Sequence, residues 1–155
     1  MKFEQKNGKH KRYVIKALFD TNVLVSGFAS FKHPSRAPAQ LLHLWQAEFF
    51  ELCISEHIIA EVKKTLDVDY FKRRLKPEDI DEAITLISEE CTIISITTPV
   101  KGVATHPEDD LVISAAISGK VNYLVTGDQP LLNKVGNSYR GVTLTTPNDF
   151  LKLLQ

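Results

Sequence analysis

The sequence is poor in the features that mark several large classes of protein. It has only two cysteines in 155 residues, Cys53 and Cys91, and each lies within an apolar run. Cysteines so far apart are more typical of two buried thiols than of a disulfide framework or a cysteine metal site. No apolar run approaches the roughly 20 residues that a transmembrane helix needs. We therefore expect a cytoplasmic protein that does not cross a membrane.

The chain also lacks net charge, because its 19 basic and 19 acidic residues balance, but the charge is unevenly spread. Residues 1–12 hold five bases and one acid, which leaves 14 bases and 18 acids for the remainder. This start is too polar for a signal peptide, so we expect a flexible basic arm (1–12) followed by one domain (13–155). An acidic domain would need local basic patches or metal ions to bind a polyanion.

Apolar, strand-like segments alternate with helical patterns along the rest of the chain. We expect strands over residues 13–19, 50–54, 91–96, 121–125 and 142–144. We expect helices to begin near residues 37, 56, 77, 107 and 147, and residues 20–22 and 127–130 to form turns. Ser55 is the predicted N-cap of the second of these helices. This alternation predicts an α/β fold with a mainly parallel sheet.

Acidic side chains follow several of the predicted strands. Asp20 ends the first strand and precedes Asn22, while Thr126 and Asp128 follow the strand over 121–125. Glu61 lies in a predicted helix, and Asp109 and Asp110 open another. Each acid alone is equally consistent with a helix cap, a turn or a solvated position. Because parallel strands deliver their carboxyl ends to one edge, we expect these acids to lie close together.

Carboxylates gathered at one edge without matching bases repel one another unless they are protonated or share a cation. Oxygen ligands of this kind suit Mg²⁺ or Mn²⁺. One or two such ions could serve an in-line displacement at phosphorus. Asn22 and Thr126 lie close enough in sequence to orient the carboxylates.

Four segments resemble, in order, the motifs of PIN-domain ribonucleases. They are residues 16–26 (KALFDTNVLVS), 55–62 (SEHIIAEV), 106–116 (HPEDDLVISAA) and 123–128 (YLVTGD). The sequence is most similar to the PIN-family toxins of prokaryotic toxin–antitoxin pairs. The resemblance implies a mainly parallel sheet flanked by helices on both faces. It also implies an Mg²⁺- or Mn²⁺-dependent endoribonuclease that a small antitoxin protein neutralises.

The same resemblance assigns the metal-site acids to Asp20, Glu61, Asp110 and Asp128. Asp20 and Asp110 are the expected direct ligands, with Glu61 and Asp128 completing the site. Asp110 is preferred to Asp109 because an apolar run follows it directly, as it follows the family acid. Asp109 stays an alternative, since the preceding His-Pro-Glu departs from the acid-rich form of this motif.

Several alternatives remain open at this stage. Asp20 at a strand end is also consistent with an aspartate-dependent phosphatase, although Asn22 stands where a general acid is expected. A non-catalytic PIN-fold module is a further alternative, and a homo-oligomer is possible. A basic stretch could contact RNA or be a solvated helix face; it comprises Lys72, Arg73, Arg74 and Lys76. The histidines show no metal-ligand spacing with the cysteines.

Overall fold

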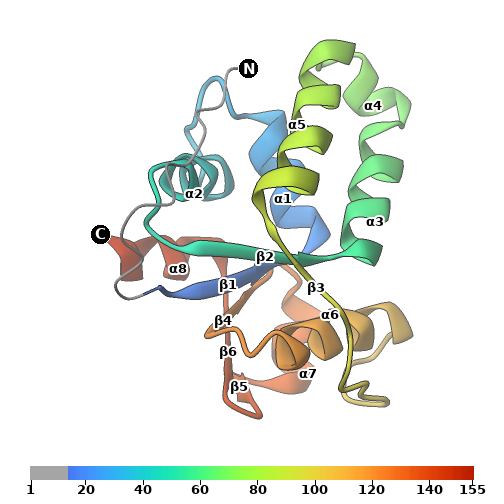
Figure 1. Cartoon of the computed structure of the whole chain (residues 1–155), viewed down its shortest axis with the longest axis vertical. Coiled ribbons are helices and arrows are strands. Elements are labelled where there is room, and N and C mark those ends of the chain that lie inside the picture. The colour runs from blue at the N-terminus through green and yellow to red at the C-terminus, as the bar shows by residue number, and fades with distance from the viewer. Residues whose placement is uncertain (1–13) are drawn as a thin grey trace.

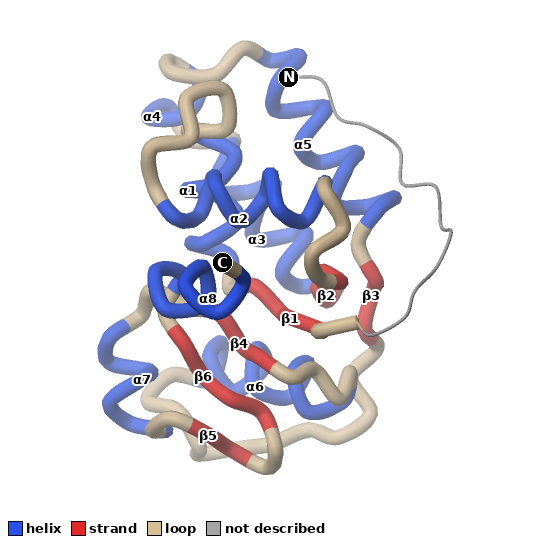
Figure 2. Tube along the Cα trace, turned by 90° about the vertical axis from the view of Figure 1, so that its left-hand side faces the viewer, coloured by secondary structure: helices blue, strands red, loops and turns tan. Residues whose placement is uncertain are grey.

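The computed structural model describes residues 14–155, so the predicted basic arm lies outside the described residues. The strands there form a six-stranded sheet in the order β3-β2-β1-β4-β6-β5 (Figure 2). Their bounds are β1 (Lys16–Phe19), β2 (Glu51–Ser55), β3 (Thr92–Ile94), β4 (Tyr123–Val125), β5 (Ser138–Tyr139) and β6 (Val142–Thr145). Every neighbouring pair is parallel except β5 with β6. The prediction of a mainly parallel sheet is confirmed.

Helices cover both faces of this sheet, as the PIN resemblance implied. Helices α1, α2, α3 and α5 lie on one side and α6 lies on the other (Figure 1). The helix bounds are α1 (Thr21–Ala29), α2 (Ala37–Gln46), α3 (Glu56–Leu66), α4 (Asp69–Lys72), α5 (Pro77–Glu90), α6 (Pro107–Ser118), α7 (Gln129–Val135) and α8 (Pro147–Leu154). All five predicted helix starts are confirmed, and proline occupies the first turn of α2, α5, α6 and α8.

Two helices, α1 and α7, begin where the sequence analysis expected turns, although it left a helix cap at Asp20 open. Asp20 and Asp128 are the N-caps of α1 and α7, and each side chain accepts a backbone N–H of its own helix. The turn prediction failed because aspartate favours turns and helix N-caps for the same reason, its short side chain that accepts backbone N–H groups. Helix α1 is also rich in residues of modest helix propensity, and burial of Val23, Leu24 and Phe28 stabilises it instead.

Aromatic side chains close the core beneath α8. The ring centroid of Phe150 lies 6.1 Å from that of Phe19 and 5.2 Å from that of Phe50. Cys53 and Cys91 are buried free thiols, as expected, and burial raises the pKa of Cys53 to about 12. Between residues 14 and 155, no helix has the length and apolar character needed to cross a membrane.

Gly27 sets the approach of α1 to α2. A Cβ atom at this position would lie 2.5 Å from Cδ1 of Leu42 and 3.0 Å from the carbonyl oxygen of Pro38. We expect Gly27→Ala to lower the free energy of unfolding by about 1–3 kcal/mol, because overpacking outweighs the gain in helix propensity. Urea denaturation measures this difference. Ser26→Ala, at an exposed position of the same helix, is the control and should leave stability equal or slightly higher.

Candidate active site

The carboxyl ends of the central strands bring the predicted acids to one edge of the sheet. Phe19 pairs with Val125 across β1 and β4, so the residues that follow, Asp20 and Thr126, lie side by side. The backbone N–H of Asp20 continues this pairing by donating to the carbonyl of Val125 over 3.0 Å. Asp20 and Thr126 are both buried.

Two threonines hold the carboxylate of Asp20. Its Oδ1 accepts the backbone N–H of Thr21 over 2.8 Å, and its Oδ2 accepts the hydroxyl of Thr126 over 2.9 Å. The Thr126 Oγ1 in turn accepts the backbone N–H of Asp128 over 3.1 Å. Thr126 therefore links the acid that ends β1 to the acid that caps α7.

Thr21 links Asp20 to Glu61 in the same way. Its hydroxyl donates to Oε2 of Glu61 over 3.0 Å, from the start of α1 to the middle of α3. Sequence reasoning did not single out Thr21, and a threonine directly after a strand-end acid is too common to reveal such a role. Asn22, by contrast, is exposed on α1 and makes no hydrogen bond to these acids.

Asp109, rather than Asp110, interacts electrostatically with Asp20 and Asp128. Burial raises the pKa of Asp109, and the carboxylates of Asp128 and Asp20 raise it further. Burial likewise raises the pKa of Asp20; the hydrogen bonds from Thr126 and Thr21 oppose the shift, while the carboxylates of Glu61 and Asp128 add to it. Asp20, Glu61, Asp109 and Asp128 thus repel one another at this edge, and we refer to them as the acidic site.

Asp110 points its carboxylate to the loop that precedes α6. Its Oδ1 accepts the backbone N–H groups of Ala104 and Val103 over 2.8 and 3.1 Å, and its Oδ2 accepts that of Gly102 over 2.9 Å. These hydrogen bonds, with that from Ala104 the strongest, lower the pKa of Asp110. The sequence analysis preferred Asp110 to Asp109 as a metal ligand. In the structure, however, the Asp110 carboxylate is hydrogen-bonded to the loop before α6.

Two serines continue this attachment along the same face of α6. Ser114 Oγ accepts the backbone N–H of Val100 over 2.9 Å, and Ser118 Oγ accepts those of Thr97 and Thr98 over 3.0 Å each. Residues four apart lie on one helix face, so Asp110, Ser114 and Ser118 form a row. This row holds the loop over residues 97–104 against α6.

The stability that Asp110 contributes should depend on pH. Its lowered pKa means that the contribution is fully present above the ordinary aspartate pKa of about 3.9 and is lost as pH falls through the folded-state pKa. We expect Asp110→Asn to lower the free energy of unfolding at pH 7 by about 1–3 kcal/mol, because the amide cannot accept all three N–H groups. Urea denaturation from pH 3 to pH 7 should show a smaller loss of stability on acidification in the variant. Equal pH profiles would contradict this role.

The basic stretch predicted as a possible RNA contact lies in and directly after α4. Lys72 pairs with Asp67, with 3.1 Å between Nζ and Oδ1. The Arg74 guanidinium stacks on the ring of Tyr70, 3.6 Å from its centroid, and donates to the Tyr70 carbonyl over 2.8 Å. Arg73 and Lys76 are exposed. The positive charge of Lys72 is therefore compensated by Asp67, whereas the other bases of this stretch have no acidic partner among the ion pairs found in residues 14–155.

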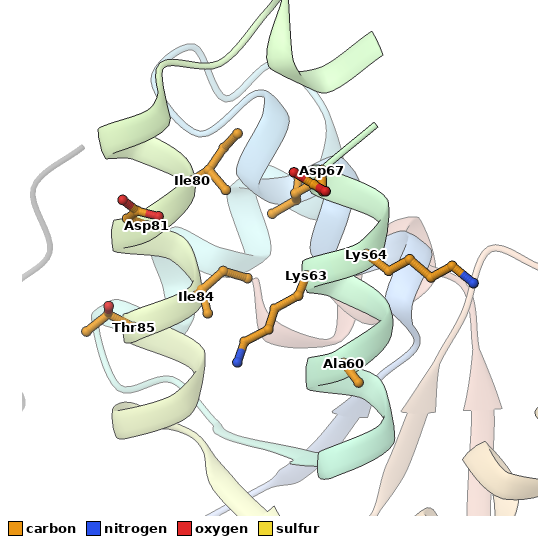
Figure 3. Close-up of a pocket in the computed structure, with 9 residues that line it drawn as sticks. Ala60, Lys63, Lys64, Asp67, Ile80, Asp81, Ile84 and Thr85 are labelled. Atoms are coloured by element: carbon orange, nitrogen blue, oxygen red, sulfur yellow. The ribbon is translucent and has the colours of Figure 1, made fainter. Parts of the chain in front are cut away.

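A groove of about 680 Å³ lies between α3 and α5, apart from the acidic site (Figure 3). Ile80 and Ile84 line its α5 wall, and Lys63 extends into the space between the helices while Lys64 turns away. None of the acids of the site lines this groove. The groove and the acidic site are therefore separate features.

The acidic site has the donor chemistry of a site for a hard divalent cation. Its donors are carboxylate oxygens that raise one another's pKa values, and His106 opposes this effect at Asp109. Within residues 14–155, no three acidic, histidine or cysteine side chains already converge as a metal cage. The residues present fit such an ion chemically.

Comparison with known proteins agrees with this fold. The family model of the PIN domain matches residues 16–130, and the chain belongs to the PIN-domain family. No curated protein matches it.

Two solved structures share the fold. One is VapBC2 from Rickettsia felis bound to a DNA fragment from their promoter, with a TM-score of 0.57, 19% identity and coverage of 85% of this chain and 98% of that one. The other is PAE2754 from Pyrobaculum aerophilum, with a TM-score of 0.54, 20% identity and coverage of 90% of this chain and 95% of that one. At sequence identities of 19% and 20%, this similarity shows a shared fold and nothing more.

Proposed function

We propose that this protein is a metal-dependent endoribonuclease, active in the cytoplasm. The observation that carries the proposal is the cluster of Asp20, Glu61, Asp109 and Asp128, in which burial and the neighbouring carboxylates raise the pKa values of Asp20 and Asp109. These acids would hold one or two Mg²⁺ or Mn²⁺ ions. A bound ion of this kind activates water and stabilises the leaving oxygen of a phosphodiester. Hydrolysis would leave a 5′-phosphate and a 3′-hydroxyl.

The residues around the acids support this assignment. Thr21 and Thr126 fix the orientation of Asp20, and Thr21 also fixes Glu61. Asp109 replaces Asp110 as the third acid in our proposal, because the Asp110 oxygens are taken by loop amides. Asn22, and not an acid, stands two residues after Asp20, which disfavours the alternative of an aspartate nucleophile in a phosphatase.

We further propose that the enzyme is the toxin of a toxin–antitoxin pair. One of the structures that share its fold, VapBC2, is bound to a DNA fragment from their promoter, and the sequence motifs resemble those of PIN-family toxins. A small antitoxin protein would then be its partner, and self-association of the toxin is compatible with this role. RNA would be held in part by the basic stretch of Lys72, Arg73, Arg74 and Lys76.

Divalent ions should stabilise the protein in a pH-dependent way. The raised pKa values of Asp20 and Asp109 mean that the ion-free protein loses stability as pH rises from about 4 through those folded-state values. Adding Mn²⁺ at pH 7 should therefore raise the melting temperature, by the equivalent of about 2.7 kcal/mol at a hundredfold excess over Kd. The shift should shrink toward pH 4, where the acids are protonated.

The control for this measurement is Asp81→Asn, which changes an exposed acid of α5 and should keep the full shift. A melting temperature that ignores both Mn²⁺ and Mg²⁺ at pH 7 would count against the metal site.

Paired substitutions at the start of α6 test which acid serves the reaction. We expect Asp109→Asn to reduce metal-dependent RNA cleavage by about 100-fold or more, because it removes a carboxylate ligand. Asp110→Asn should retain most of the cleavage per folded molecule, since its carboxylate serves the loop. Cleavage of a labelled RNA under single-turnover conditions, with folding checked by circular dichroism, provides the comparison. A larger loss of cleavage in Asp110→Asn than in Asp109→Asn would instead support Asp110 as the third acid, as the sequence analysis preferred.

A further inference from the structure

His57 adjoins the acidic site without belonging to the acids that define it. It lies in the first turn of α3, four residues before Glu61, so the two side chains share a helix face. Burial lowers the pKa of His57, while the carboxylates of Glu61 and Asp20 act in the opposite direction. The imidazole is therefore within electrostatic reach of both acids.

Ser55 holds one nitrogen of this ring. The Ser55 hydroxyl lies 2.6 Å from Nδ1 of His57, and Ser55 itself is buried at the carboxyl end of β2. Ser55 is the N-cap of α3, as predicted, yet its side chain makes no capping hydrogen bond to the helix backbone. A serine cap ordinarily stabilises its helix by accepting a backbone N–H of the first turn. Here the hydroxyl orients the imidazole instead.

The second ring nitrogen has no such partner. Nε2 of His57 is buried and makes no hydrogen bond within the described part of the chain. Buried polar atoms without partners are rare and destabilise the folded state. Histidines that bind metals commonly donate one ring N–H to a fixed oxygen and present the other nitrogen to the ion. In the tautomer in which Nδ1–H donates to the Ser55 hydroxyl, Nε2 presents a lone pair of this kind.

We propose that His57 supplies a nitrogen ligand to the divalent ion of the acidic site and that Ser55 orients it. This inference rests on the proposed metal-dependent function. An imidazole among carboxylates favours transition-metal ions over Mg²⁺, so the site should select Mn²⁺ over Mg²⁺. Because the donors do not yet converge among residues 14–155, side-chain rotation on ion binding completes the ligand set.

Pulsed EPR of the protein loaded with Mn²⁺ alone tests the ligand directly. Coordination by imidazole produces ¹⁴N modulation of the Mn²⁺ signal, which we expect in the wild-type protein. His57→Asn keeps a polar group near the Nδ1 position for Ser55 but removes Nε2, and should abolish the modulation. His43→Asn is the matched control and should keep it, since His43 lies on α2 and its Nε2 contacts the carbonyl of Phe31 over 2.8 Å.

Calorimetric titration with Mn²⁺ and with Mg²⁺ gives a second readout that does not depend on activity. The preference for Mn²⁺, expressed as the ratio of the two dissociation constants, should fall about tenfold or more in His57→Asn and by a smaller factor in Ser55→Ala. Bound Mn²⁺ without ¹⁴N modulation in the wild-type protein, or modulation that persists in His57→Asn, would overturn the inference and leave the proposed nuclease intact. Failure of the wild-type protein to bind either ion would overturn both.

Discussion

The structure depends on keeping several carboxylates close together at the carboxyl edge of the sheet. Burial and mutual repulsion both oppose their ionisation, as the raised pKa values of Asp20 and Asp109 show. Two features of the fold counteract this cost. The hydroxyls of Thr126 and Thr21 donate to Asp20 and Glu61. In addition, Asp20 and Asp128 are the N-caps of α1 and α7, and Asp109 lies in the first turn of α6, so these acids lie at the positive ends of three helix dipoles.

The sequence predicted most of the fold because its helices and strands carry strong local signals. A proline in the first turn located α2, α5, α6 and α8, and an apolar stripe supported the prediction of α2 and α5. Helix α1 lacked such a signal, since Gly27 and its β-branched residues disfavour a helix locally. Its stability comes from contact with α2 and α3, which no local pattern reveals. The same holds for α7, whose Asp128-Gln129-Pro130 start equally suits a turn.

The site was predictable to the extent that strand ends determine it. Asp20 and Asp128 follow β1 and β4, which are neighbours in the sheet, so their proximity follows from parallel pairing. The choice between Asp109 and Asp110 did not follow, because it depends on how the loop before α6 folds back onto that helix. His57 was also beyond sequence reasoning, since its proximity to Asp20 depends on the pairing of β1 with β2. A search for histidine spacing relative to cysteine cannot detect a histidine among carboxylates.

The opposite behaviour of Asp109 and Asp110 explains how α6 can begin at a repulsive site. Successive helical residues point about 100° apart, so one carboxylate faces the acids while its neighbour faces the loop. Asp110 accepts three backbone N–H groups there, and Ser114 and Ser118 extend the attachment along the helix. These bonds hold the first turn of α6 in place although Asp109 is repelled by Asp128 and Asp20. The loop before α6 thus stabilises a position that the acids alone would disfavour, and the burial of Asp109 beside them depends on it.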